Sequence, residues 1–239
     1  MAVKSIVVDI NNNKCSFDIS YDILNSKNDK IVVFLHGWGS NKNIMKQAFG
    51  SFCQNMKHIY IDMPGFGNSS NDTVLTTDDY SKILNNFFNQ IDVKPDIIAG
   101  HSFGGKVATL LNPDLLVLLS TAGIIEEKPL SVKLKIKIAK LFNLLGLNNI
   151  TKIFRSSDVE NMSENMYKTF KNVVDEDFSE IFKNYNKPVK IFWGKDDTAT
   201  SLNSGKTINS LIKNSDFKAY DGDHYFFLQH AKDIAKCIC

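Results

Sequence analysis

A serine flanked by glycines follows an apolar segment near the middle of the chain. Residues 100–104 are Gly-His-Ser-Phe-Gly, directly after the run Ile97–Ala99 and at the start of a segment with helical character that extends through Leu111. A serine between a strand and a helix lies on a tight, strained turn, where flanking glycines avoid side-chain clashes and the hydroxyl projects above the sheet. The N-terminus of the helix also favours developing negative charge. The segment therefore predicts a strand, a turn and a helix that present Ser102 as a candidate nucleophile.

Short β-rich segments recur on both sides of this turn and predict an α/β fold with eight strands. They cover residues 5–10, 16–23, 31–35, 58–61, 96–99, 115–120, 189–193 and 216–220. Only a polar turn separates the first two, which predicts an antiparallel hairpin. From Ile31 onward, helical patterns such as those that begin at Thr76 or Thr77, Ser204 and Tyr225 separate most strands, so the central sheet is expected to be parallel. A chain of 239 residues, 43% of them hydrophobic, can bury one substantial core.

The alternation of strands and helices stops between Gly123 and Pro188, where apolar residues keep helical spacing. Helices are expected over residues 131–145, 148–154, 163–173 and 178–184. An all-helical insertion of this size predicts a lid rather than a second domain with its own core. We therefore expect a core of residues 1–123 and 188–239, with residues 124–187 as a helical cap inserted between the sixth and seventh strands. The cap needs to bury its apolar faces, and the carboxyl-terminal edge of the sheet offers the surface.

Composition argues against several classes of partner. The formal net charge of +2 comes from scattered residues, and the chain has a single arginine, Arg155, so no nucleic-acid partner is expected. No apolar run approaches the roughly 20 residues that span a bilayer. Residues 1–13 lack the continuous apolar segment of a signal peptide, so we expect a cytoplasmic protein without stable membrane insertion. The four cysteines have neither metal-site spacing nor a disulfide framework, so we expect reduced thiols and no metal.

Three further motifs stand in order around the serine turn. His36-Gly37-Trp38-Gly39 follows one predicted strand, Asp62-Met63-Pro64-Gly65-Phe66-Gly67 follows the next, and Asp197 and His224 come after the insertion. With these motifs the chain resembles the α/β hydrolases over nearly its whole length, in the subgroup with a helical cap. The resemblance implies the α/β-hydrolase fold, a mostly parallel eight-stranded sheet flanked by helices. It also implies serine chemistry, which requires neither a cofactor nor a metal.

The resemblance assigns a catalytic triad. Ser102 is the expected nucleophile, His224 its base and Asp197 the acid that orients the base. A serine hydroxyl becomes a good nucleophile when a neutral imidazole accepts its proton, and a carboxylate holds the imidazole in the right tautomer and stabilises its cation. Asp196 is the alternative acid, and the family's Gly-x-x-Asp spacing from Gly194 selects Asp197.

The family also places two backbone amides as donors to the oxyanion, and these correspond to Trp38 and Phe103. Preorganised N–H groups stabilise charge that appears only in the tetrahedral intermediate. His36 is interpreted as a buried support for the loop of Trp38, and His101 as a residue that points away within the turn. Asp62 is expected to stabilise the glycine-containing turn that follows it, with no catalytic role.

The expected substrate is a small molecule, a small or medium carboxylic ester or thioester that is cleaved through an acyl-serine intermediate. The loops that contain Trp38 and Asp62 resemble those of pimeloyl-carrier methyl esterases, although such loops are widely shared. The sequence gives no basis for naming a protein partner. Docking of an acidic carrier on the lysine-rich residues 133–140 is an alternative to the favoured interpretation of these lysines as a solvated surface.

Two other functions remain open. Relatives with the same triad and cap hydrolyse a carbon–carbon bond in 2-hydroxy-6-oxo-dienoate products of ring cleavage, and Arg155 would then be the candidate to hold the substrate carboxylate. A noncatalytic ligand-binding protein on the same fold is the alternative of another class. Its usual mark is a missing triad member, and none is missing here.

Overall fold

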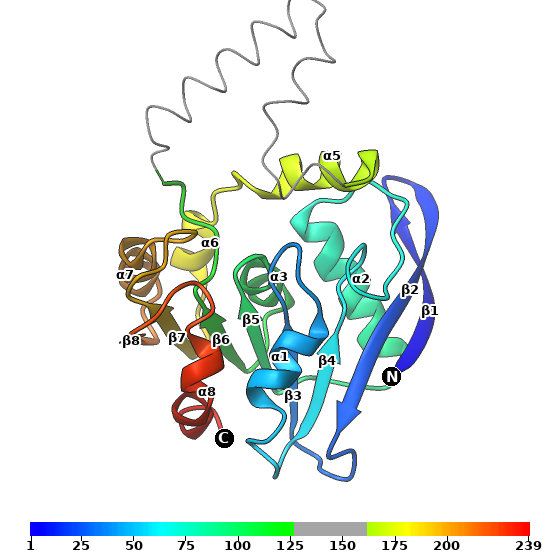
Figure 1. Cartoon of the computed structure of the whole chain (residues 1–239). Helices are drawn as coiled ribbons and strands as arrows, with labels where there is room; N and C mark the ends of the chain where they lie inside the picture. Colours follow the sequence, from blue (N-terminus) through cyan, green and yellow to red (C-terminus); the bar gives the residue numbers. More distant parts are fainter. Residues whose placement is uncertain (127–161) are drawn as a thin grey trace, which may run out of the picture.

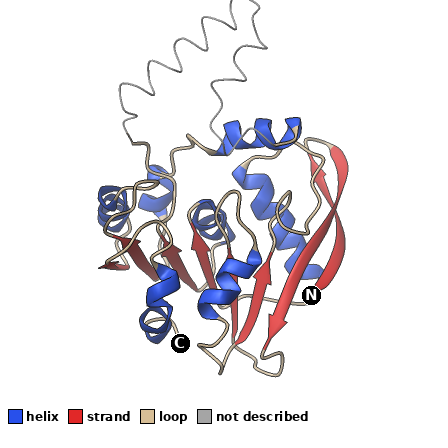
Figure 2. Ribbon diagram, in the orientation of Figure 1, coloured by secondary structure: helices blue, strands red, loops and turns tan. Residues whose placement is uncertain are grey.

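The computed structural model describes residues 1–126 and 162–239, which form one eight-stranded sheet flanked by helices (Figures 1 and 2). The strands are β1 (Ala2–Ile10), β2 (Asn13–Leu24), β3 (Ile31–Leu35), β4 (Lys57–Ile61), β5 (Ile97–His101), β6 (Leu115–Leu119), β7 (Val189–Gly194) and β8 (Ser215–Tyr220). All eight predicted strands are present, with small differences at their ends. The predicted α/β fold class is confirmed.

The sheet has the strand order β1-β2-β4-β3-β5-β6-β7-β8. β2 pairs antiparallel with β1 and β4, whereas β4, β3, β5, β6, β7 and β8 run parallel. β1 and β2 form the predicted hairpin. Its turn residues Asn11 and Asn12 have φ values of 51° and 65°, the left-handed conformation that asparagine tolerates in two-residue hairpin turns. The parallel arrangement brings the carboxyl ends of β3, β5, β7 and β8, and the loops that follow them, to one edge of the sheet.

Helices cover both faces of the sheet (Figure 1). One face is covered by α1 (Lys42–Phe49) and α8 (Phe227–Lys236), and the other by α2 (Thr77–Gln90), α3 (Phe103–Leu111) and α7 (Leu202–Leu211). Each face has its own apolar cluster. The central strands β3 to β7 are almost entirely buried, which explains why β3 and β6 are continuous apolar runs rather than alternating ones.

Helix α2 begins at a clear local signal. The side chain of Thr76 accepts a hydrogen bond from the backbone N–H of Asp79, and the Asp79 carboxylate accepts one from the N–H of Thr76. This reciprocal capping box satisfies two backbone donors that the first helical turn leaves unpaired. The helix start predicted at Thr76 or Thr77 is confirmed.

The structure describes only part of the predicted insertion. Helices α5 (Glu164–Val173) and α6 (Ser179–Asn184) confirm two of the four helices expected there. The helices predicted over residues 131–145 and 148–154, together with Arg155 and the lysine-rich segment, lie outside the described residues.

Cysteine pairing differs from the prediction. Cys53, in the turn before β4, and Cys239 form a disulfide with their Cα atoms 5.5 Å apart, while Cys15 and Cys237 are free. The expectation of four reduced thiols was therefore wrong. The two paired residues are 186 positions apart, and they meet because α8 packs beside α1. Spacing in the sequence carries no signal of such a pair.

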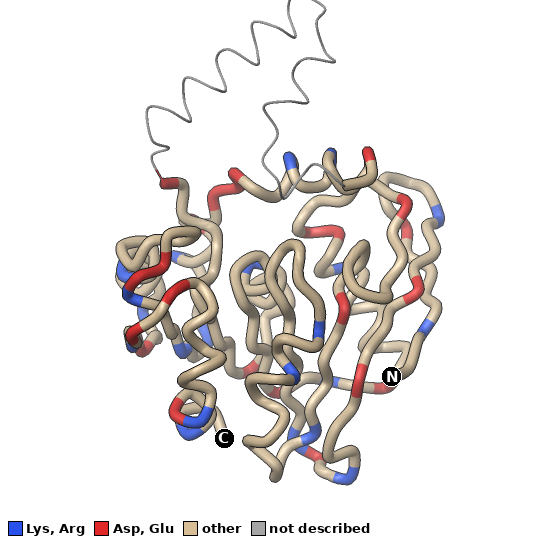
Figure 3. Tube along the Cα trace, viewed as in Figure 1, with Lys and Arg blue, Asp and Glu red and all other residues tan. Residues whose placement is uncertain are grey.

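Charged residues are distributed over many elements, with acidic and basic positions intermixed (Figure 3). Within residues 1–126 and 162–239, no helix is both long enough and apolar enough to cross a bilayer. The expected lack of a nucleic-acid partner and the cytoplasmic location stay predictions.

Candidate active site

Ser102 lies on a strained turn between β5 and α3. Its backbone has φ 52° and ψ −118°, a region that side-chain-bearing residues rarely occupy and that is typical of strained functional turns. Gly100 permits the turn, since a Cβ there would lie 2.3 Å from the carbonyl oxygen of Gly104. The predicted strand, turn and helix are confirmed, and the serine stands at the carboxyl-terminal edge of the sheet.

The loop of Trp38 lies directly against this serine. A Cβ on Gly37 would be 2.9 Å from Nδ1 of His101 and 3.1 Å from Cβ of Ser102, so only glycine allows this approach. Phe103 is the first residue of α3, and its backbone N–H therefore has no acceptor within the helix. The structure thus brings both predicted oxyanion residues next to Ser102, while the role of their amides stays a prediction.

His36 holds this loop from within the protein. Its Nδ1 lies 2.7 Å from the carbonyl oxygen of Gly37, and its Nε2 accepts a hydrogen bond of 3.0 Å from the N–H of Met63. Nδ1 must therefore carry the proton. Burial lowers the pKa of His36 to about 4, so the ring is neutral at neutral pH. The expected role of His36 as a buried support is confirmed.

Asp62 organises the neighbouring turn. Its carboxylate accepts hydrogen bonds from the backbone N–H groups of Lys42 (2.7 Å) and Asn68 (3.0 Å), and it pairs with the ammonium group of Lys42. Both partners of this ion pair are buried, and the ammonium also donates to Ser20 Oγ at 2.9 Å. Asp62 is fully engaged in structure, as expected.

Asp197 and His224 form a pair in the loops after β7 and β8. Nδ1 of His224 lies 2.7 Å from Oδ2 of Asp197, while Oδ1 accepts hydrogen bonds from the N–H groups of Ala199 and Thr200 at 2.8 and 2.9 Å. Burial raises the pKa of Asp197, but the hydrogen bonds from His224 and Thr200 outweigh this effect and lower it to about 2. The ionised carboxylate fixes the proton on Nδ1 and leaves Nε2 free to accept another. Asp196, the alternative acid, is exposed.

His101 packs against His224 and does not point away from the site. Its Nε2 is 3.0 Å from the carbonyl oxygen of His224, and the ring centroids are 4.5 Å apart. Nε2 therefore donates, while the buried Nδ1 has no hydrogen-bond partner among the residues that the structure describes. Burial, together with the proximity of His224, lowers the pKa of His101 to about 3. The sequence interpretation was wrong here, because His101 supports the loop of the base.

Aromatic side chains surround the loop of Trp38. The ring of Trp38 lies 4.8 Å from that of Phe66, 5.5 Å from that of Phe103 and 5.3 Å from that of Phe170 on α5, measured between centroids. Helix α5 is also anchored to the core, because Oγ1 of Thr169 accepts a hydrogen bond of 3.0 Å from the N–H of Leu75. A helix of the insertion therefore contacts the loop beside Ser102.

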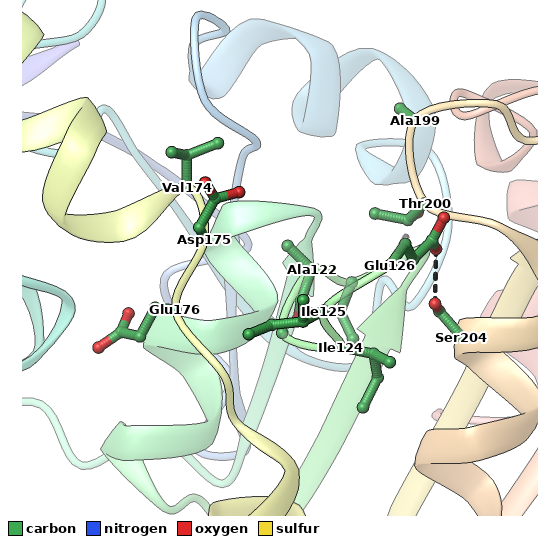
Figure 4. A pocket seen from close by; sticks show the side chains of 12 residues that line it. Ala122, Ile124, Ile125, Glu126, Val174, Asp175, Glu176, Ala199, Thr200 and Ser204 are labelled. Carbon is green, nitrogen blue, oxygen red and sulfur yellow. Dashed lines mark hydrogen bonds between the residues drawn. The ribbon is translucent and has the colours of Figure 1, made fainter. Parts of the chain in front are cut away.

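A cavity of about 280 Å³ lies beside Ala199 and Thr200, in the loop that also contains Asp197 (Figure 4). It is lined by residues 121–126, residues 174–176, Ala199, Thr200 and Ser204. Thr121 Oγ1 donates to the carbonyl oxygen of Ser102 at 3.1 Å, and Thr200 Oγ1 donates to Oδ2 of Asp197 at 3.0 Å. Residues that hold the candidate nucleophile and acid thus form part of the cavity lining.

Two contributors to this region were not predicted from the sequence. His101 supports the loop of His224, and Lys106 is buried in α3 one turn after Ser102. The sequence offers one signal that could have identified Lys106 as a buried residue: it is the single charged residue in a helix of small and apolar residues. In the described parts of the chain, no three His, Cys, Asp or Glu side chains are grouped to hold a metal ion.

The arrangement of Ser102, His224 and Asp197 is suited to attack by a serine that a neutral imidazole activates.

The sequence matches the model of the alpha/beta hydrolase family over residues 32–236. It is 32% identical over 105 residues to an sn-1-specific diacylglycerol lipase of Danio rerio, a match that covers 41% of this chain and 33% of that protein. It is also 32% identical over 83 residues to a pimeloyl-[acyl-carrier protein] methyl ester esterase of Proteus mirabilis, which covers 35% of this chain and 31% of that protein. The matched segment spans about a third of each relative's length.

The fold is similar to that of solved esterases. An esterase from Exiguobacterium antarcticum superposes with a TM-score of 0.74, and the match covers 98% of each chain at 18% sequence identity. At this identity the likeness shows the fold alone.

Proposed function

The chain belongs to the alpha/beta hydrolase family, and we propose that it is a serine hydrolase that cleaves a small or medium carboxylic ester or thioester. The observation that carries the proposal is the convergence of three groups at one edge of the sheet. These are the strained turn of Ser102, the hydrogen-bonded pair of Asp197 and His224, and the loop of Trp38. Two matched relatives, a lipase and a methyl ester esterase by name, support an ester as the substrate.

In the proposed mechanism, Nε2 of His224 accepts the proton of the Ser102 hydroxyl while Oγ bonds to the carbonyl carbon of the substrate. The electron pair of the C=O bond moves to its oxygen, and the backbone N–H groups of Trp38 and Phe103 stabilise the resulting oxyanion. The carbonyl then re-forms, the bond to the leaving alcohol or thiol breaks, and His224 gives its proton to the leaving group. Water attacks the acyl-serine by the same steps and releases the acid.

We further propose that residues 124–187 form a helical cap on a core of residues 1–123 and 188–239. The contact between Phe170 of α5 and Trp38 supports this arrangement, because it places part of the insertion beside the oxyanion loop. A cap at this position would limit the access of water to the acyl-serine. A cytoplasmic location stays a prediction, and the disulfide of Cys53 and Cys239 is a point against it, since disulfides rarely persist in reducing compartments.

A panel of chromogenic esters from acetate to octanoate, one thioester and one ring-fission diketone tests the function. We expect the wild-type protein to cleave the esters, and Ser102→Ala to lower this activity by at least about 10³-fold without loss of fold, judged by circular dichroism. A fluorophosphonate should label Ser102, and His224→Ala should abolish rapid labelling. Cleavage of the diketone alone would favour carbon–carbon bond hydrolysis. Lack of both turnover and labelling would favour a noncatalytic binding protein.

A further inference from the structure

A buried lysine links the helix of the candidate nucleophile to the segment after α5. Lys106 is only 1% exposed. Its ammonium group donates to the carbonyl oxygen of Val173 at 2.5 Å and to Oε2 of Glu176 at 3.0 Å. A charge at this depth is retained only where such partners compensate for lost hydration. Lys106 is therefore a tertiary connection and not a solvated surface charge.

Glu176 extends the connection to a third element. Its Oε2 also accepts a hydrogen bond of 2.5 Å from Oγ1 of Thr77, at the start of α2. The ammonium group of Lys106 also lies 5.0 Å from the centroid of the Phe178 ring. Burial lowers the pKa of Lys106, whereas the nearby Glu176 carboxylate acts in the opposite direction. Three residues, Lys106, Glu176 and Thr77, are here called the Lys106 clamp. They join three parts of the protein: helix α3, the start of helix α2 and the segment that follows α5.

The clamp holds one wall of the cavity beside the site. Val174, Asp175 and Glu176 line the cavity, and Figure 4 shows Val174 and Asp175 across from Ala199 and Thr200. Residues 174–178 lack regular secondary structure. Backbone hydrogen bonds hold the two ends of this segment, from Val174 to Phe170 and from Phe178 to Gly123, and side-chain contacts add to them in between. The contacts of the Lys106 ammonium with Val173 and Glu176 bracket the wall at both ends.

We propose that the Lys106 clamp determines acyl-chain selectivity by fixing the wall of a cavity that accepts the uncharged acyl chain of the substrate. The inference rests on the proposed ester hydrolysis. Ala122, Ile125 and Val174 give the cavity apolar surface, and Thr121 and Thr200 connect it to Ser102 and Asp197. Its volume of about 280 Å³ is near the lower end for small-molecule pockets, which fits a short or medium chain.

The test is the ratio of kcat/KM for an octanoate ester to kcat/KM for the acetate ester with the same alcohol. Lys106→Met keeps the length of the side chain and removes the charge. We expect it to change this ratio by at least about tenfold. Contacts between a pocket wall and one or two methylene groups of a substrate typically change kcat/KM by about this factor. Lys187→Met is the matched control. Lys187 also donates to a carbonyl oxygen, that of Asn112 at 2.6 Å, and pairs with Asp114 near the other end of α3, but neither partner lines the cavity, whereas Glu176, the partner of Lys106, does.

A second variant tests whether the chain occupies the cavity. Val174→Trp fills the space from the clamped wall, so it should lower kcat/KM for octanoate at least about tenfold more than for acetate. If Lys106→Met does not fold, Glu176→Gln replaces it, because this change weakens the same clamp at a partly exposed residue. It should change the octanoate-to-acetate ratio in the same direction as any Lys106 variant that folds.

Some results would overturn the inference while leaving the proposed function intact. An equal decrease for both esters in the clamp variants, or an unchanged ratio in Val174→Trp, would show that the clamp is only structural or that the chain binds elsewhere. A wild-type protein that cleaves no ester would instead contradict the proposed function itself. Loss of ester cleavage in Ser102→Ala, measured in parallel, separates these two failures.

Discussion

Individual residues at the candidate site are held in defined conformations and charge states. Ser102 has a positive φ, Asp197 is ionised although buried, and His36 and His101 are kept neutral by burial. Each state is stabilised by named partners, such as the two N–H groups that donate to Asp197. These groups are therefore preorganised before a substrate binds, which is the condition for electrostatic catalysis.

The acid of the triad is the first residue-scale prediction. Asp197→Asn should reduce kcat by about 10⁴-fold, because an amide no longer fixes the proton on Nδ1 of His224. Asp196→Asn, one position earlier on the same loop, is the matched control and should have a small effect, since that side chain is exposed. Steady-state kinetics on one good ester measures both. The reverse ranking would assign the acid to Asp196.

Buried neutral histidines make the stability of the protein depend on pH. The pKa values of His36 and His101 are about 4 and about 3 in the folded protein, below the ordinary value of 6.5. Between pH 6.5 and about 4 the unfolded chain therefore binds more protons than the folded one, so acidification favours unfolding. The free energy of unfolding should fall by about 1.4 kcal/mol per pH unit for each such histidine.

Urea unfolding of the wild-type protein and His101→Gln at pH 7, 6 and 5 measures this dependence. Glutamine retains a donor for the carbonyl oxygen of His224 but does not titrate. We expect a smaller slope in the variant, by the contribution of one histidine. Equal slopes in the two proteins would mean that His101 takes up protons as readily in the folded state as in the unfolded chain.

At the scale of elements, local signals predicted what local interactions determine. The alternating and continuous apolar runs identified every strand, and Thr76 identified the start of α2. Helix α1 was not predicted. It has eight residues, and one of its buried residues, Lys42, is charged, so its apolar pattern is too short and too interrupted to stand out. Its start depends on Asn41, whose side chain caps the first turn.

Helix α5 carries the element-scale prediction. Phe170→Ala removes the contact with Trp38 and should lower the free energy of unfolding by about 1 to 2 kcal/mol, because the ring is only partly buried. If the insertion covers the site as proposed, the variant should also change relative rates among acyl chains. Lys168→Ala, on the exposed side of the same helix, should change neither. A Phe170 variant with lower stability but wild-type relative rates would make α5 a structural element only.

Across the whole molecule, the unpredicted side-chain contacts share one cause. His101 contacts a residue 123 positions away, Lys106 reaches 67 and 70 positions along the chain, and Cys53 pairs 186 positions away. None of these separations along the sequence is determined by a repeat or a local pattern. Asp197 and His224 were predictable because the family resemblance supplied their positions, and not because the intervening residues encode their contact. Tertiary packing therefore determines the supports of the site, while motifs determine its central groups.

The disulfide gives the prediction at the scale of the whole chain. With Cys53 and Cys239 paired, thiol labelling of the denatured, unreduced protein should detect two thiols, those of Cys15 and Cys237, and reduction should raise the number to four. The bond closes a very long loop and so restricts the unfolded chain. Reduction should therefore lower the free energy of unfolding by about 2 to 4 kcal/mol. Cys239→Ser should unfold at the same urea concentration with or without reductant. Detection of four thiols in protein that was oxidised with glutathione and never reduced would show that the pair does not form in solution.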